Sequence, residues 1–277
     1  LKHAYNASFE WGCLSRYLGM KLPPEQWRCT MLHGLYAGYP AGLDAMGRAL
    51  GLAEDKRKFN TGKALIRYFC TPCAPTKANG GRTRNLPHHD PEKWALFKEY
   101  NRQDVVTEME IGRRLSAFPV PDFVQKQWET DLIINARGVA LDMGLVRGAL
   151  DLGENVRRTL TNKAAQLSGL QNPNSVAQLA GWLQEATGEE VADLRKDTVS
   201  KMLGREDNCP EVRRMLEIRQ ELGKTSTKKY NAMEAAVCKD GRVRGLLQFY
   251  GANRTGRWAG RLVQVQNLPR TYTEPLP

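Results

Sequence analysis

Two short patterns in the first part of the chain place acidic and aromatic side chains where they could handle a metal ion. Asn6, Phe9 and Glu10 lie within one helical turn in the stretch NASFE. Tyr100 and Asp104 are four residues apart in KEYNRQDVVTE, so on a helix both project from the same face. Carboxylates that hold two magnesium ions about 4 Å apart are the usual means of cleaving a phosphodiester. Taken singly, each pattern is better explained by structure alone, with Tyr100 packed in a core and Asp104 and Glu10 solvated.

A third pattern near the end of the chain combines positive charge with many hydrogen-bond donors. The stretch RTGRWAGRLVQVQNLPR, residues 254–270, holds four arginines, two glutamines and an asparagine, and no acidic residue. Guanidinium and amide groups contact phosphates and base edges in nucleic-acid complexes. The alternative for each arginine is a plain surface charge, and it is strong for Arg261 and Arg270.

The net charge of +11 is concentrated at the two ends of the chain. Residues 1–115 carry a net +7, residues 116–218 a net −3, and residues 219–277 a net +7. This distribution indicates two nucleic-acid contact surfaces, although scattered surface lysines explain it about as well. Six dispersed cysteines and no long apolar run fit a reducing cytoplasm without a membrane span. A zinc site from Cys70, Cys73, His88 and His89 is set aside, because the spacing is unusual.

Helices must position most of these residues, so we expect an α/β protein that is mostly helical in this chain. Apolar spacing predicts helices over 11–20, 42–52 and 64–70, and the lysine-rich stretch 56–63 lies between the last two. Residues 70–91 are predicted to form an exposed loop. A helix is expected over 91–115 with Asp90 as its N-cap, and another over 198–203 with Asp197 as its N-cap. Further helices are expected over 122–136, 143–168 and 176–183, and from Pro210 onward into GKTSTKKY. A strand is expected over 242–251.

In order and spacing, the first two patterns resemble motifs of family A DNA polymerases, the DNA polymerase I type. NASFE resembles the second motif of their 3′ to 5′ exonuclease domain, and the stretch from Tyr100 to Asp104 resembles the third. The resemblance implies that Glu10, Tyr100 and Asp104 are catalytic, that Glu10 and Asp104 hold Mg²⁺, and that Asn6 binds DNA. The family has Asp where Glu10 stands, which changes how directly the metal is held.

The third pattern resembles the family's Thr-Gly-Arg and Gln-Asn-x-Pro segment in its bacteriophage form. Here Ala259 and Gly260 replace two serines of that segment. By the resemblance, Arg257 reaches the minor groove at the primer terminus, where every base pair offers an acceptor in nearly the same place, so the contact tests pairing geometry. The residues of this segment expected to bind DNA are Arg254, Arg257, Gln264, Gln266 and Asn267.

The middle of the chain resembles the same family in the same order. INARGVALD is similar to the segment that leads from a helix into the palm, NPNSVAQLAGWL to a thumb helix, and EIRQELGKTSTKKY to the long thumb helix. The resemblance implies that Lys224, Thr225 and Ser226 donate to DNA phosphates. It also implies a truncated, RNase H-like exonuclease domain over 1–116 without its first strands, the start of the polymerase domain over 117–150, the thumb over 151–238, and the palm entry over 239–277.

We therefore expect a DNA-directed DNA polymerase with a proofreading exonuclease, present as a fragment. The first exonuclease acids are expected before Leu1 and the palm carboxylates after Pro277, so the isolated chain should bind primer-template weakly and catalyse little. The expected partners are Mg²⁺, primer-template DNA and dNTPs, with no membrane. The expected form is a monomer in the cytoplasm, which is the host's cytoplasm for a phage protein.

Two other functions remain open on the residues. A stand-alone 3′ to 5′ exonuclease of the RNase D-like kind explains Tyr100 and Asp104 but not the segments TGR and QNLP. A non-catalytic nucleic-acid-binding protein explains the charge but not the spacing of the acids.

Overall fold

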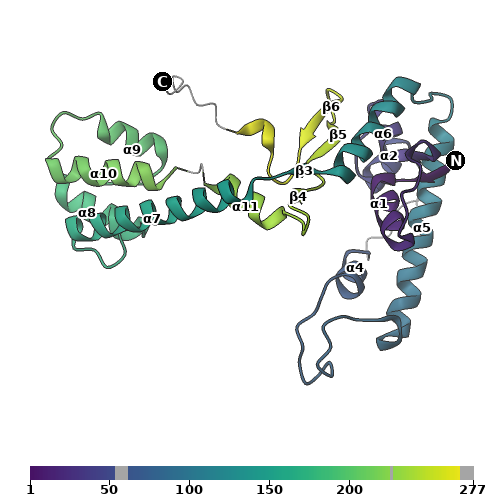
Figure 1. Cartoon of the computed structure of the whole chain (residues 1–277), viewed down its shortest axis with the longest axis horizontal. Helices are drawn as coiled ribbons and strands as arrows, with labels where there is room; N and C mark the ends of the chain where they lie inside the picture. Colours follow the sequence, from purple (N-terminus) through teal and green to yellow (C-terminus); the bar gives the residue numbers. More distant parts are fainter. Residues whose placement is uncertain (54–61, 225–226, 269–277) are drawn as a thin grey trace. The chain divides into compact units, whose positions relative to one another are not determined.

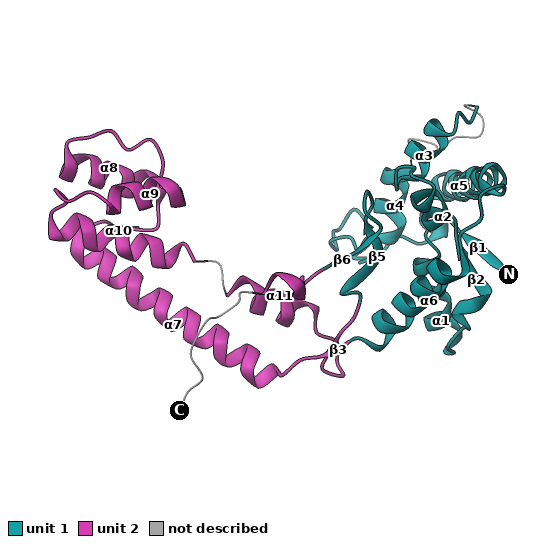
Figure 2. Cartoon of the chain, turned by 90° about the horizontal axis from the view of Figure 1, so that it is seen from above, with its two compact units in different colours: residues 1–138, 245–261 teal, residues 139–244, 262–277 magenta. Residues whose placement is uncertain are grey.

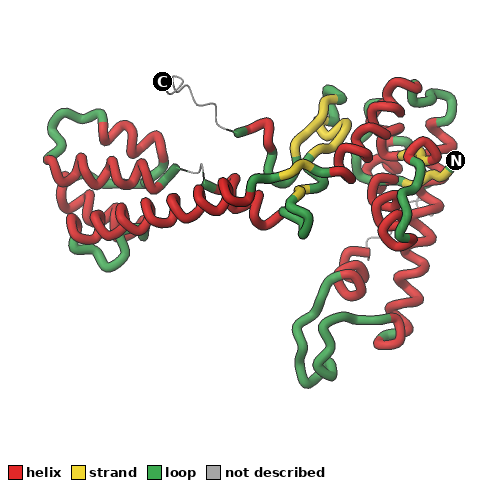
Figure 3. The backbone as a smooth tube through the Cα atoms, in the orientation of Figure 1, coloured by secondary structure: helices red, strands yellow, loops and turns green. Residues whose placement is uncertain are grey.

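The computed structural model describes residues 1–53, 62–224 and 227–268, and the chain divides into two compact units (Figure 2). The first unit comprises Leu1–Gly138 and Gly245–Arg261, and the second comprises Val139–Arg244 and Leu262–Pro277. The described residues are mostly helical, with a few short strands, as Figures 1 and 3 show. The prediction of a mostly helical α/β protein is therefore confirmed. No described helix is both long and apolar enough to cross a membrane.

The first unit begins with two short parallel strands joined through a helix. Strand β1 (Lys2–Ala4) pairs with β2 (Trp27–Cys29), and α1 (Ala7–Leu18) lies between them in the chain. The one-turn helix η1 (Pro24–Gln26) leads into β2. Because α1 follows β1 almost directly, Glu10 falls in the first turn of that helix.

Helix α5 (Pro91–Leu115) is the support on which several other helices of the first unit pack. It begins as predicted, with the Asp90 carboxylate accepting a hydrogen bond from the Lys93 main-chain N–H at 3.0 Å. Its buried residues include Tyr100, Thr107 and Ile111. The elements that contact it are α2 (Thr30–Tyr36), α3 (Leu43–Ala49), α4 (Gly62–Cys70) and the short helix η3 (Pro87–His89).

Helix α6 (Asp122–Arg137) and a hairpin from much later in the chain complete the first unit. The hairpin consists of β5 (Leu247–Ala252) and β6 (Arg257–Gly260), paired antiparallel. The Asn135 side chain of α6 joins them: its Nδ2 donates to the Leu247 carbonyl at 2.9 Å, and its Oδ1 accepts from the Leu247 N–H at 3.1 Å. The shared core contains Trp27, Trp128, Leu132 and Phe249.

The second unit is built around the long helix α7 (Met143–Ser168). The Asp142 carboxylate caps α7 by accepting from the Leu145 N–H at 3.0 Å. Strand β3 (Val139–Ala140) pairs antiparallel with β4 (Arg242–Val243). The unit's apolar core includes Leu183, Leu216 and Ile218. Its other helices are α8 (Val176–Thr187), α9 (Lys196–Leu203), α10 (Pro210–Leu222), α11 (Lys228–Ala236) and the single turn η4 (Val265–Asn267).

Three local predictions are wrong. Asp197 does not cap α9, because the helix already begins at Lys196. The Asp193 carboxylate organises that helix start instead, accepting from the Arg195 N–H at 2.8 Å and from the Thr198 hydroxyl at 2.7 Å. Helix α10 ends at Leu222 rather than continuing into the hydroxyl-rich stretch, and a separate helix, α11, follows.

The third error concerns the strand predicted over 242–251. It is divided into β4 and β5, and Gly245 between them has a φ of 69°, a left-handed conformation that interrupts an extended chain. The two halves pair with different partners and belong to different units. The predicted domain limits at 116, 150 and 238 also differ from the unit limits, and α7 runs without a break across residue 150. Those limits stay predictions about functional domains.

Candidate functional site

The carboxylate of Glu10 lies partly enclosed in the first unit. Its Oε2 atom is buried and accepts no hydrogen bond from any described residue. Burial raises the pKa of Glu10, the negative charge of Glu108 raises it further, and a main-chain hydrogen bond opposes the rise. A negative charge is therefore costly at this position, and a bound cation would stabilise it.

Glu108 is a third carboxylate that the sequence motifs do not include. It lies one helical turn after Asp104 on α5, and its residue is only 8% exposed. The Thr30 hydroxyl, at the start of α2, donates a hydrogen bond to Glu108 Oε1. The position four residues after a motif acid was a signal for it, because such residues share a helix face.

The buried thiol of Cys29 lies in the same neighbourhood. Burial raises its pKa to about 11, and the charge of Glu10 contributes to the rise. The charge of Glu10 thus affects the pKa of Cys29, and the charge of Glu108 affects the pKa of Glu10. Thr30, the residue after Cys29, makes the hydroxyl contact to Glu108.

Tyr100 and Asp104 lie on one face of α5, as predicted, and the ring of Tyr100 is closely packed. Its side chain is buried, and its ring is parallel to that of Phe97 with centroids 6.2 Å apart. A Cβ at Gly62 of α4 would lie 2.1 Å from Tyr100 Cε2, so the ring occupies the space that this glycine leaves. Asp104 is half-buried.

Asn6 is exposed and precedes α1 without capping it through its side chain. Its Oδ1 accepts a hydrogen bond from the Ser8 hydroxyl at 2.9 Å.

The described residues do not form a complete magnesium site. Glu10 and Asp104 offer carboxylate oxygens, the donors that Mg²⁺ prefers. Within residues 1–53, 62–224 and 227–268, however, no group of three or more His, Cys, Asp or Glu side chains could hold a metal ion. Two of the four side chains considered for zinc have other contacts: Cys73 Sγ donates to the Arg82 carbonyl, and His89 Nδ1 accepts from the Leu86 N–H at 2.8 Å.

The Thr-Gly-Arg sequence forms the tip and the returning strand of the β5–β6 hairpin. Arg254 is exposed in the turn, and Arg257 is exposed at the start of β6, where its Nε donates to the Thr255 hydroxyl at 3.2 Å. Gly256 has a φ of 64°, and a Cβ there would lie 2.8 Å from the Tyr250 ring. A glycine at this position is therefore required by both conformation and space.

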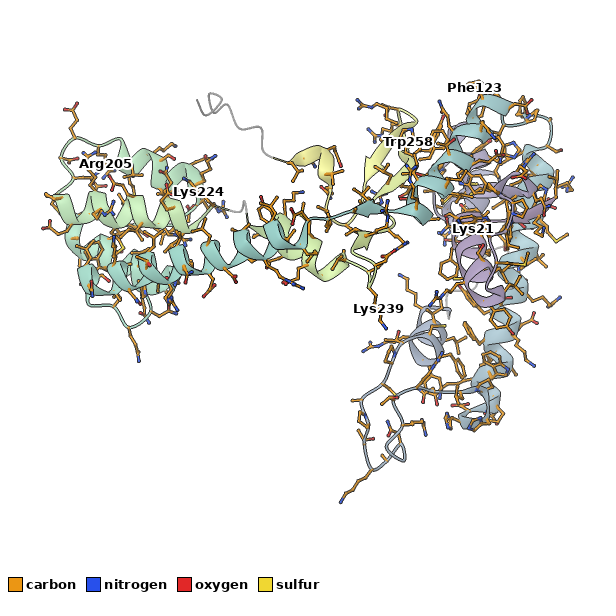
Figure 4. All side chains as sticks on the ribbon, viewed as in Figure 1. Lys21, Phe123, Arg205, Lys224, Lys239 and Trp258 are labelled. Carbon is orange, nitrogen blue, oxygen red and sulfur yellow. The ribbon has the colours of Figure 1, made fainter. Side chains whose placement is uncertain are left out.

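The other charged and aromatic residues of the hairpin have structural contacts. Arg261 donates to the Gln248 side-chain oxygen across the strand pair, which supports its interpretation as a surface charge rather than a free phosphate contact. Trp258, labelled in Figure 4, packs near Phe249 with ring centroids 5.2 Å apart.

Gln264, Gln266 and Asn267 of the same sequence motif lie in the second unit. Their segment has a strained backbone and internal hydrogen bonds. Leu262 and Gln264 adopt φ values of 53° and 51°, which are rare for residues with a side chain. Asn267 Nδ2 donates to Gln264 Oε1 at 3.0 Å, so two of the predicted DNA-binding amides contact each other. Gln266 is exposed.

Of the predicted phosphate-binding residues after α10, the structure describes only Lys224. Its ammonium is 2.6 Å from Glu221 Oε1, and 61% of its side chain is exposed, so the ion pair is weak enough to exchange partners (Figure 4). Thr225 and Ser226 lie outside the described residues, as does Arg270. Thr227 packs on α7, where a Cβ at Gly153 would lie 2.8 Å from its methyl group.

The chain is similar in structure to the POL domain of Pol1 from M. smegmatis, solved in complex with a DNA primer-template and dNTP. The TM-score is 0.52 at 17% sequence identity, and the match covers 98% of this chain and 43% of that one. At this identity the likeness defines the fold.

A comparison of sequences identifies a much nearer relative. The chain is 52% identical over 276 residues to the DNA polymerase of Bacillus phage SP02, a match that covers 100% of this chain and 42% of the phage protein. No family model matches the chain. The resemblance to phage and DNA polymerase I-type polymerases is therefore confirmed, and the chain spans less than half the length of this relative.

Proposed function

We propose that the chain acts in template-directed DNA synthesis as a phage-type, DNA-directed DNA polymerase that also carries a 3′ to 5′ excision site. The observation that carries the proposal is the 52% identity to a phage DNA polymerase along the whole chain. The polymerase-domain fold supports it independently of sequence. In this proposal the substrates are primer-template DNA and dNTPs, the protein acts as a monomer, and synthesis takes place in the cytoplasm of the host.

On the synthetic side, Arg257 is the residue that reads the primer terminus. Its exposure at the start of β6 leaves the guanidinium able to donate to a minor-groove acceptor. The Thr255 hydroxyl contact holds the arginine without neutralising it. Arg254 at the hairpin tip and Lys224 after α10 supply charge to phosphates, while Gln264, Gln266 and Asn267 supply amide donors.

On the excision side, Glu10 and Asp104 would hold Mg²⁺. The fit rests on donor chemistry and on the buried Glu10 Oε2 atom, an acceptor that no described residue satisfies. When bound, Mg²⁺ supplies a Lewis acid that stabilises charge on the phosphodiester oxygens. Tyr100 keeps α4 and α5 together, which holds Asp104 in place, and Asn6 lies at the start of α1 as an exposed amide for the DNA strand.

The proposal is tested by primer extension and by excision of a mispaired 3′ end, measured on the protein as encoded by its gene. Glu10→Gln and Asp104→Asn each remove one negative charge with little change of shape. Excision should fall at least about a hundredfold in each, because metal-ion catalysis is worth several kcal/mol, while extension should continue. Glu92→Gln is the matched control, since this exposed acid lies in the first turn of the same helix as Asp104.

The rival functions predict different results in the same assays. A stand-alone exonuclease would excise without extending, and a non-catalytic binding protein would do neither. If Asp104→Asn excises mispaired ends as fast as the unmodified protein, the assignment of the nuclease site is wrong.

A further inference from the structure

Residues 62–89, here called the basic arm, carry positive charge without any acidic residue. The arm comprises α4, the loop after it and η3, and the nearest acids in the sequence are Asp55 before it and Asp90 after it. Elsewhere in the first unit many cations pair with carboxylates, as Arg48 does with Asp44 and Arg102 with Glu99. Among the described residues, none of the arm's cations forms an ion pair: Lys63, Arg67, Lys77, Arg82 and Arg84.

The loop of the arm has a defined shape, although it contributes no buried apolar side chain. Figure 3 shows it as a long loop between α4 and α5. The Asn79 side chain accepts from the Thr76 N–H at 2.9 Å and donates to the Ala74 carbonyl at 2.8 Å. Arg82 Nε donates to Asn85 Oδ1 at 2.8 Å, and Asn85 donates to the Tyr68 carbonyl at 3.0 Å. These contacts order the loop before any ligand binds, which lowers the entropy cost of binding.

A row of aromatic rings fixes the arm to the helix that carries Tyr100 and Asp104. Phe69 of α4 lies 5.2 Å from Trp94 and 5.5 Å from Phe97 between ring centroids. Phe97 in turn stacks on Tyr100. The rings of Trp94 and Phe97 are only half-buried. Unpaired cations, an ordered loop and part-exposed rings therefore occur together on the candidate excision unit.

We propose that the basic arm binds the phosphates of single-stranded DNA. Unpaired Lys and Arg side chains supply sequence-independent attraction to phosphates, and part-exposed aromatic rings beside them suit unpaired bases, which can stack. A duplex, whose bases are already stacked, would use only the charges. The inference rests on the proposed function, because excision requires a single strand near Glu10 and Asp104.

The test compares two pairs of exposed cations that change the net charge equally. Lys77→Ala with Arg84→Ala removes two charges from the arm, and Arg16→Ala with Lys21→Ala removes two from the first unit outside it (Lys21 is labelled in Figure 4). Binding to a fluorescein-labelled oligothymidylate of about 20 nucleotides is followed by anisotropy between about 50 and 200 mM salt. The arm variant should bind several-fold more weakly, and the slope of log K against log salt should be shallower by roughly 0.7 for each lost contact. The control variant should keep the slope of the unmodified chain.

A second variant tests the order of the loop without changing its charge. Asn79→Ala removes the contacts to Thr76 and Ala74 but leaves every cation in place. The affinity for the oligothymidylate should fall while the salt slope stays the same, because the phosphates contacted are unchanged. Unaltered affinity would overturn the claim that the ordered loop is part of the site.

Failure of this inference is distinguishable from failure of the proposed function. If the protein extends and excises but both double variants bind the oligothymidylate equally, the arm is not a DNA site, and an acidic protein surface becomes the partner to test. If the protein neither extends nor excises, the proposed function fails, while selective weakening in the Lys77 and Arg84 variant would still identify the arm as the binding site.

Discussion

The Lys229 ammonium donates a hydrogen bond to the main-chain carbonyl of Val263 at 2.8 Å. The contact joins α11 to the segment that carries Gln264, Gln266 and Asn267, and both partners belong to the second unit. Val263 is only 1% exposed, whereas the residues around it are exposed. Leu262 and Gln264 on either side of Val263 have left-handed backbone conformations, which cost conformational free energy. The hydrogen bond from Lys229 therefore stabilises a strained backbone segment.

Removing the hydrogen bond from Lys229 to Val263 should increase the backbone fluctuations of residues 262–268. In Lys229→Met the Val263 carbonyl loses its charged donor, and we expect faster hydrogen–deuterium exchange in peptides that cover 262–268. Primer-template affinity should fall several-fold, since the amides must then be ordered during binding. Lys228→Met is the control, because it removes the same charge from the exposed neighbouring position. Equal exchange in the two variants would show that the hydrogen bond does not hold the segment.

The hydrogen bond from Thr30 to Glu108 should contribute measurably to the stability of the first unit. Thr30→Val keeps the shape but leaves a buried carboxylate without this donor, so unfolding should become easier by about 1.5–3 kcal/mol. A double-mutant cycle with Glu108→Leu, which removes the acceptor, measures the coupling through urea unfolding. Thr130→Val is the matched control, because that hydroxyl is exposed and donates only to the Lys126 carbonyl of its own helix. A coupling energy near zero would contradict the contact.

Stability should also depend on pH through Asp131. Burial raises the pKa of Asp131 from 3.8 to about 6, while hydrogen bonds from the Phe249 N–H and from Asn135 oppose the rise. Between these values the folded state binds more protons than the unfolded state. Stability should therefore fall as pH rises from about 4 to about 6 and then level off, with a total change of at most about 3 kcal/mol.

The variant Asp131→Asn should flatten this dependence, as measured by urea unfolding followed through tryptophan fluorescence across that pH range. Asp151→Asn, which changes an exposed acid on α7, should leave the dependence intact. An unchanged slope in Asp131→Asn would assign the pH dependence to other groups.

Helix limits with strong local signals could be predicted from the sequence. Asp90 followed by Pro91 predicts the start of α5 correctly, because the cap and the ring act on the first turn alone. The prediction that Asp197 caps α9 failed because a second acid lies nearby. Asp193, four residues earlier, accepts the hydrogen bonds that organise the start of this helix. The end of α10 and the division of the strand over 242–251 depend on packing between distant segments, which short patterns do not encode.

The candidate site was predictable in part. The motifs select Glu10, Asp104 and Arg257, whose roles stay predictions, because each occurs at a recognisable spacing. Glu108 belongs to no motif; its position four residues after Asp104 places it on the same helix face, but its contact with Thr30 of α2 depends on the fold. Residues 70–91, which include the loop of the basic arm, were predicted as an exposed loop, but the order of this loop comes from side chains such as Asn79 that bind the backbone nearby. The contact from Lys229 to Val263 joins residues 34 apart in the sequence, so only the folded structure reveals it.

Primer extension by Arg257→Ala, in the protein as encoded, tests the account most directly. A hydrogen bond from a charged donor to the primer terminus is worth about 1.5–3 kcal/mol, so extension efficiency should fall roughly ten- to a hundredfold. The loss should shrink when the primer end is mispaired, because the minor-groove acceptor is then displaced. Arg16→Ala, an exposed arginine on α1, should extend normally. If Arg257→Ala extends matched and mispaired primers as the unmodified protein does, this arginine does not read the primer terminus and the central claim fails.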